Sequence, residues 1–121
     1  MMYTNLPIFK ASLDLAVYLD TIVKNQDRYH RYTIGSDLRE HSKQILFFVS
    51  KANRARDKNR VEILKRLVER CEEIKILLML AKELKAFKSF KQFEHSSKLT
   101  VNISKQAKGW LLKSRKARTV A

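Results

Sequence analysis

Apolar residues recur at intervals of three and four along almost the whole chain, and few residues interrupt that pattern. The 121 residues include one proline and two glycines. Apolar side chains with this spacing share one face of an α-helix, whereas Pro and Gly weaken or end a helix. The sequence therefore predicts an all-α fold made of a few long helices.

Four segments carry the apolar pattern, and a helix-starting signal stands at or near the beginning of each. Pro7 suits a first helical turn, Thr33 is a good N-cap, and Asn59 with Glu62 and Ser89 with Gln92 resemble capping boxes. The expected helices cover residues 7–24, 33–52, 60–84 and 89–114.

Short connections between four helices in a chain of this length predict an up-and-down antiparallel four-helix bundle. Residues 1–114 are expected to form this single domain, and residues 115–121 a flexible basic tail. Gly35 lies in the first turn of the second expected helix, where a missing side chain allows another part of the chain to approach closely. We interpret it as a packing glycine.

The charge of the chain predicts a polyanionic partner. Lys and Arg outnumber Asp and Glu by 26 to 12, which gives a net charge of +14 and a pI of about 10.2. Nucleic acid and anionic membrane are the two candidates. No apolar stretch approaches the roughly 20 residues that span a bilayer, and the first residues do not resemble a signal peptide. We therefore expect a cytoplasmic protein without a membrane partner.

The sequence offers little for catalysis. Its acidic residues occur at salt-bridging intervals from basic ones, and its three histidines are scattered without metal-binding spacing. Small helical ribonucleases carry an Arg and a His on one helix, but Arg39 is too close to His41 for that pattern. Cys71 is a lone thiol at an apolar position, expected to be buried and inert. We expect no enzymatic activity, no metal and no cofactor.

The basic residues are more informative. Along the last expected helix Lys88, Lys91, Lys98 and Lys105 share one face, and no acidic residue follows Glu94. A second basic group lies at the turn between the second and third helices. Because no base-reading motif is present, we expect recognition of the backbone or shape of RNA and DNA. The predicted contacts are Lys88, Lys91, Lys98, Lys105, Lys108, Lys113, Arg115 and Lys116, together with Arg54, Arg56, Lys58 and Arg60.

Four stretches of the chain resemble the signature segments of one protein family. They are LPIFKASLDLAVYL (6–19), RYTIGSDLRE (31–40), LKAFKSFKQFEHSSKL (84–99) and GWLLKSR (109–115). In order and spacing they resemble the accessory variability determinant proteins of diversity-generating retroelements. That family is related to small four-helix-bundle proteins encoded in ribosomal RNA intervening sequences.

The resemblance implies a non-catalytic protein that binds a reverse transcriptase and its template RNA or cDNA and supports mutagenic retrohoming. It also implies a ring-like homo-oligomer, a homopentamer, in a bacterial cell or phage-infected host. Apolar residues in excess of one core stripe, on the first and third helices, would then pack between subunits. The alternative is an RNA-binding protein of the intervening-sequence type without a polymerase partner.

The resemblance adds two basic residues of the third helix, Lys75 and Lys82, to the predicted nucleic-acid contacts. Met79 stands where the family has a second arginine. Residues 25–27 replace its Phe-Pro pair, and Lys108 replaces the first of two glycines before Trp110.

Overall fold

The protein, seen in a computed structural model, is described over residues 6–120, with the backbone alone for residues 118–120. This range holds five helices and no strand, which confirms the all-α prediction. Residues 1–5 and 121, which the predicted domain and tail include, lie outside the described residues. The helices are α1 (Pro7–Lys24), α2 (Arg28–Tyr32), α3 (Ile34–Arg54), α4 (Asp57–Glu83) and α5 (Phe90–Val120).

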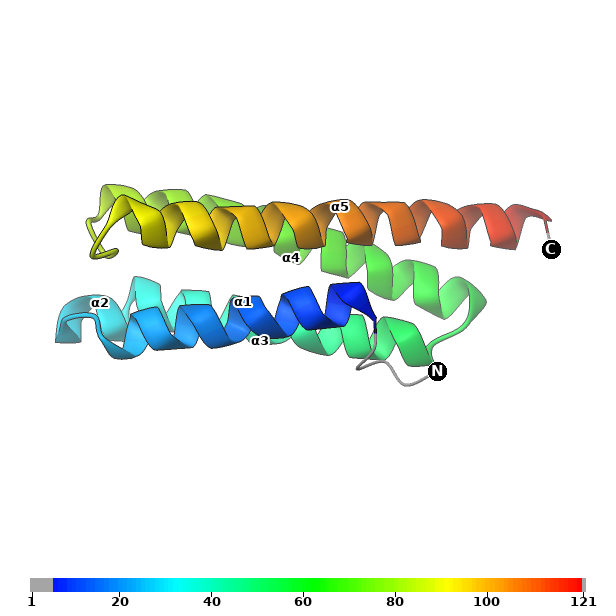
Figure 1. The fold of residues 1–121 in the computed structure, drawn as a ribbon. Coiled ribbons are helices and arrows are strands. Elements are labelled where there is room, and N and C mark those ends of the chain that lie inside the picture. Colours follow the sequence, from blue (N-terminus) through cyan, green and yellow to red (C-terminus); the bar gives the residue numbers. More distant parts are fainter. Residues whose placement is uncertain (1–5, 121) are drawn as a thin grey trace.

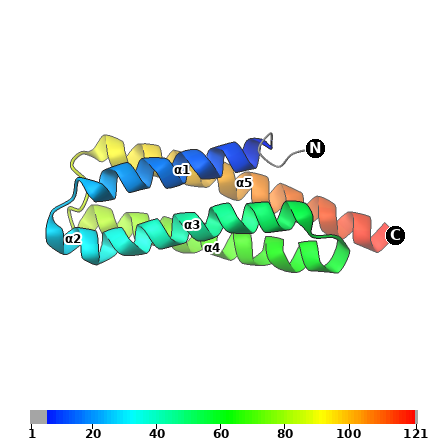
Figure 2. The ribbon, with the colours of Figure 1, turned by 90° about the horizontal axis from the view of Figure 1, so that it is seen from below.

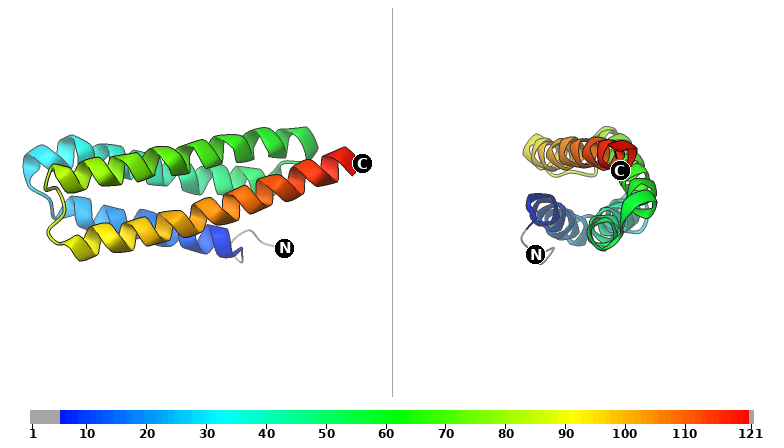
Figure 3. Two further views of the ribbon diagram at one scale, coloured as in Figure 1. Left: turned by 90° about the horizontal axis from the view of Figure 1, so that it is seen from above. Right: turned by 90° about the vertical axis from the view of Figure 1, so that its right-hand side faces the viewer.

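The four long helices lie side by side as a bundle, and each runs opposite to the long helix before it (Figures 1 and 2). α3 packs against α1 and α4, and α5 packs against α4 and α1. Seen along the bundle in Figure 3, the four surround a common interior. Each helix supplies fully buried side chains to it, among them Leu15, Leu19, Leu38, Ile45, Leu64, Ile74, Leu78 and Ile103.

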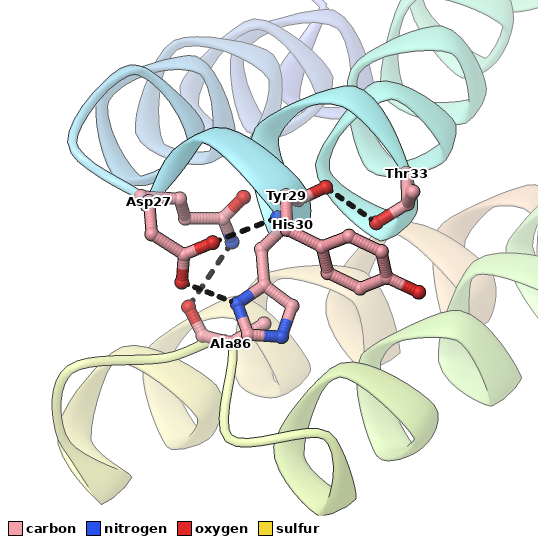
Figure 4. Close-up of polar contacts among 6 residues, drawn as sticks. Asp27, Tyr29, His30, Thr33 and Ala86 are labelled. Atoms are coloured by element: carbon pink, nitrogen blue, oxygen red, sulfur yellow. Dashed lines mark hydrogen bonds and ion pairs between the residues drawn. The ribbon is translucent and has the colours of Figure 1, made fainter.

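The short helix α2 was not expected from the sequence, whose predicted helices leave residues 25–32 as a connection. Asp27 begins α2 because its carboxylate accepts a hydrogen bond from the backbone N–H of His30 at 3.0 Å, an N-cap (Figure 4). The other carboxylate oxygen lies 2.6 Å from His30 Nδ1. These bonds hold the pKa of Asp27 below its usual range, with the backbone bond as the largest cause.

The start of α3 agrees with the prediction, but its capping does not. Thr33 occupies the N-cap position, yet its hydroxyl donates backward to the Tyr29 carbonyl at 2.8 Å and caps no amide of α3 (Figure 4). α4 begins at Asp57, three residues before the expected start, so Asn59 lies inside the helix and not at its cap. Asp57 has a positive φ of 50°, a conformation that Asp tolerates better than most residues.

Lys85 ends α4 by adopting a φ of 60°. The Ala86 N–H reaches the Ala81 carbonyl at 2.9 Å and the Lys85 N–H reaches the Lys82 carbonyl at 3.0 Å, which is the Schellman pattern. The Ala86 carbonyl then accepts a buried hydrogen bond from Gln26 Nε2 at 3.1 Å. The connection after α1 and the connection after α4 are therefore tied together at one end of the bundle.

α5 begins as predicted and ends later. The Ser89 hydroxyl accepts from the Gln92 N–H at 3.4 Å, and the Gln92 side chain accepts from the Lys88 N–H at 2.9 Å. The Phe87 and Phe93 rings lie 6.1 Å apart across this start, as a hydrophobic staple would. The expected end near Ser114 was wrong, because α5 continues to Val120 and includes residues predicted to be a tail.

Gly35 is confirmed as a packing glycine. A Cβ built on it would lie 2.8 Å from both the His30 carbonyl oxygen and Val23 Cγ1, and in contact with Gln26 Oε1. The same position at Gly109 has no atom within 4 Å among the described residues, apart from its chain neighbours and the backbone of its own helix. Close packing of α1, α2 and α3 therefore requires a glycine at residue 35.

We expect Gly35→Ala to lower the free energy of unfolding by about 1–3 kcal/mol, because the methyl group displaces backbone as well as side-chain atoms. The matched control is Gly109→Ala, which should raise it by about 0.5–1 kcal/mol because alanine is the better helix former. Urea unfolding followed by circular dichroism measures both. An unchanged or raised stability in Gly35→Ala would contradict the packing role.

Candidate nucleic-acid interface

A row of three lysines runs along the outer face of α5. Lys91, Lys98 and Lys105 are two turns apart, on the face opposite the buried stripe that contains Thr100 and Ile103. Successive members are about 10.5 Å apart along the axis, from a rise of about 1.5 Å per residue. All three are exposed, and none has an ion-pair partner among the described residues. We call them the lysine row.

Other predicted contacts of the last segment surround the lysine row. Lys116 lies on the same face, farther toward the end of α5, and Lys88 lies just before the helix. Lys113 and Arg115 are also exposed. Lys108 differs, because its Nζ lies 2.9 Å from Glu72 Oε1 on α4. Most of the predicted residues of the last segment thus lie on one basic surface, whereas Lys108 forms an ion pair with Glu72 of α4.

A shallow groove of about 420 Å³ lies beside the lysine row. Phe90, Phe93 and Val101 supply its apolar lining, and Lys98 and Lys105 also line it. Glu94, the one acidic residue of α5, lines it as well. The groove places apolar surface next to positive charge, an arrangement that suits both the sugar–base face and the phosphates of a nucleic-acid strand.

The second predicted cluster divides into two parts. Arg54, Arg56 and Lys58 are exposed at the connection between α3 and α4. Arg60 is not part of an open surface: its Nε donates to the Ala52 carbonyl at 2.9 Å and its Nη2 to the Asn53 carbonyl at 3.1 Å. Its guanidinium also lies 5.8 Å from the centroid of the Trp110 ring. Arg60 therefore caps the end of α3 and joins it to α5.

The two α4 lysines that the family resemblance added to the predicted contacts, Lys75 and Lys82, also contact other side chains of the bundle. Lys75 Nζ lies 3.2 Å from Glu72 Oε1 and donates to the Ser104 hydroxyl at 3.3 Å, so it joins α4 to α5. Lys82 Nζ lies 4.9 Å from the centroid of the Phe93 ring. Sequence spacing alone could not separate these lysines from lysines without such contacts.

The Glu72 carboxylate pairs with two of the predicted lysines, Lys75 and Lys108. Hydrogen bonds from Lys108 and Lys75 lower its pKa, with Lys108 as the larger cause. The spacing between Glu72 and Lys75 indicates their pairing in the sequence, but only the packing of α5 on α4 brings Lys108 to the same carboxylate.

Burial explains the chemistry of Cys71. It raises the pKa of the thiol to about 12, so the thiol stays protonated and unreactive at neutral pH. His41 lies 3.3 Å from Glu73, and the His95 ring meets the edge of the Tyr18 ring. No group of three His, Cys, Asp or Glu side chains within residues 6–117 could hold a metal ion. In the same part of the chain, no helix has the length and apolar character of a membrane span.

Exposed apolar side chains lie on α4 and on α1, the two long helices on which the sequence indicated apolar residues in excess of one core stripe. These helices do not pack against each other, so the side chains form two separate surfaces. Ile76 and Met79 are 61% and 52% exposed on α4, and Val17 is 59% exposed on α1. Leu80 and Leu84 continue the α4 surface and line a pocket with Tyr29 and Tyr32 of α2. A face of this kind is typical of a protein–protein contact.

Comparison of the chain with models of protein families, with curated proteins and with solved structures gives no match.

We expect Glu72→Gln to lower the free energy of unfolding at pH 7 by less than about 1 kcal/mol, since the carboxylate is partly exposed. A lowered folded pKa stabilises the protein above the unfolded value of about 4.5 and loses that effect as the pH falls through the folded value. The difference between parent and variant should therefore vanish below that pKa. Urea unfolding at pH 7 and at acid pH tests this, and a constant difference would contradict the pairing.

Proposed function

We propose that the chain is a non-catalytic accessory protein of a diversity-generating retroelement. It binds the reverse transcriptase of the element, holds template RNA and cDNA on its basic surface, and supports mutagenic retrohoming in the cytoplasm of a bacterial cell or phage-infected host. The proposed nucleic-acid binding rests on the lysine row of α5, which is exposed and has no ion-pair partner among the described residues. The proposed binding to a reverse transcriptase rests on the resemblance of four sequence segments to that family.

Charge geometry supports phosphate binding by the lysine row. Exposed lysines about 10.5 Å apart match the axial rise of about three nucleotides of one strand. Each cation that neutralises a phosphate releases counterions, so affinity should fall steeply with salt. Most acidic residues of α4 form ion pairs with nearby basic residues, such as Glu62 with Lys65 and Glu73 with Arg70. The lysine row on the outer face of α5 forms no such pair among the described residues.

The exposed apolar side chains of α1 and α4 support assembly with protein. We propose that the chain is an up-and-down four-helix bundle that assembles into a ring-like homo-oligomer, a homopentamer. The exposed apolar residues of α1 and α4 would then become buried between subunits. Val17, Ile76 and Met79 are the residues on which this packing rests. Their burial would stabilise the assembly in the same way that the interior stabilises each subunit.

The variant Lys91→Glu, Lys98→Glu, Lys105→Glu should lose at least tenfold in affinity for structured RNA, RNA·DNA hybrid and duplex DNA. The slope of log K against log salt should become shallower by about 2–3, close to 0.9 for each lost contact. Fluorescence anisotropy over a salt series measures both quantities. The RNA is recovered afterwards and checked for integrity, because cleavage would contradict a non-catalytic role.

The matched control replaces three exposed basic residues on other helices, Lys10, Lys43 and Arg66, with glutamate. This variant has the same change in net charge. It should bind within about threefold of the parent, since phosphate contacts and not net charge dominate affinity. If the two variants lose affinity equally, the lysine row is not the binding surface. Circular dichroism should show that both remain folded.

The assembly is tested by Val17→Glu and Ile76→Glu, each measured by light scattering after size-exclusion chromatography. We expect the parent to be a homo-oligomer and the variants to be smaller, because a buried carboxylate without a partner costs several kcal/mol. Lys43→Glu on α3 is the control and should leave the mass unchanged. A monomeric parent would contradict the proposed ring.

Co-purification with the reverse transcriptase encoded beside the gene separates the two candidate roles. A stable complex supports the retroelement role. If RNA binding persists but no such enzyme is encoded nearby or retained by the protein, the intervening-sequence type of function is the correct one.

A further inference from the structure

A pocket of about 450 Å³ lies between α1, α2 and the start of α3, on other helices than the lysine row. Its five lining residues are Lys24, Arg31, Tyr32, Ser36 and Arg39. Three of the five are cations and none is an acid. Cations gathered in one concave site repel one another, so an arrangement of this kind favours a bound anion.

The Nε atom of Arg31 gives the pocket an unused donor. This atom is buried and has no hydrogen-bond partner in the described part of the chain. A buried donor without a partner costs about 1–3 kcal/mol, so native structures rarely leave one unsatisfied. Because this atom has almost no accessible surface, an acceptor bound at the pocket relieves that cost only when the Arg31 guanidinium turns toward it. Lys24 is exposed and has no ion-pair partner within residues 6–117 either.

The first turn of α3 adds further donors at the same place. Ser36 lies in this turn and lines the pocket. Thr33 does not cap the helix, because its hydroxyl is bonded to the Tyr29 carbonyl. The early amides of a helix have no partner within the helix, and its positive dipole end attracts anions. The start of α3 therefore reinforces the three cations.

Two acids lie near enough to compete. Asp37 is in the first turn of α3, directly after Ser36, and lines an adjoining pocket with Tyr32 and Ser36. Asp20 Oδ1 accepts from Arg39 Nε at 2.9 Å. A guanidinium has five N–H donors, and this bond uses one of them. Asp20 thus orients Arg39 without consuming the two Nη groups that can fork onto a second acceptor.

We propose that this pocket is a binding site for a phosphate group, carried by a mononucleotide or by the 5′ end of a nucleic-acid strand. Arg31 and Arg39 hold the phosphate oxygens, Lys24 supplies a point charge, and the Ser36 hydroxyl donates a hydrogen bond. The volume exceeds that of a bare phosphate and suits a nucleotide-sized ligand. The site lies on other helices than the lysine row and does not rest on the proposed function.

The test is a titration of the ¹⁵N-labelled protein with adenosine monophosphate, followed by nuclear magnetic resonance. Saturable shifts are expected at the Ser36 amide and at the Arg31 Nε–H, and adenosine should give none. Parallel titrations use inorganic phosphate and a trinucleotide with and without a 5′ phosphate. Shifts with both phosphate and nucleotide assign the site to any phosphate, and shifts with the 5′-phosphorylated strand alone assign it to strand ends.

Arg31→Gln and Arg28→Gln form a matched pair. Both guanidinium groups lie about 6 Å from the Tyr32 ring centroid, at 5.7 and 6.0 Å, but only Arg31 lines the pocket. Arg31→Gln should raise the Kd for adenosine monophosphate at least tenfold, and Arg28→Gln by less than about twofold. The exposed Lys24→Gln, which does not disturb buried groups, should also weaken binding.

Two results would overturn the site: no saturable shift with any phosphate-bearing probe, or an equal loss in Arg28→Gln and Arg31→Gln. The same titration on the triple lysine-row variant keeps this proposal separate from the proposed function. Its phosphate binding should be unchanged even though its RNA binding is lost.

Discussion

Burial of the apolar stripe of α4 is the constraint on which the rest of the bundle depends. Leu64, Leu67, Ile74 and Leu78 are almost completely buried, and they pack where α3 and α5 meet α4 from two sides. Each such side chain stabilises the fold by about 1.5–3 kcal/mol relative to exposure. Because this stripe fixes how α5 lies on α4, it also decides which lysine of α5 meets an acid of α4 and which lysines lie on the outer face.

The separation of charges follows from that packing. On the α4 side of α5, Lys108 and Lys75 meet Glu72, and Lys75 also meets Ser104. On the opposite side the lysine row has Glu94 as its one acidic neighbour, forms no ion pair among the described residues and carries a concentrated positive charge. A chain with a net charge of +14 tolerates this repulsion because burial of the common interior outweighs it. The proposed nucleic-acid partner would relieve the repulsion.

The sequence predicted the all-α class, most of the helix boundaries and the outward position of the lysine row, because these depend on local periodicity. It did not predict α2, whose N-cap bond from Asp27 is clear only once the backbone turns there. It also placed Arg60 among phosphate contacts, although the guanidinium bonds two carbonyls at the end of α3. Contacts across long separations, such as Gln26 with the Ala86 carbonyl, leave no periodic signal in a single sequence.

The sequence by itself determined the class of fold and the sign of the surface charge, since helical spacing and net charge are properties of the chain before it folds. Only the tertiary structure decided which cations are engaged and which are available. Lys108 and Lys105 are chemically equal and close in sequence, but one meets Glu72 and the other faces solvent. The pocket of Lys24, Arg31 and Arg39 likewise exists only because three helices converge. The physical reason is that ion pairing and burial depend on distances between helices, and the spacing of residues along one helix does not determine those distances.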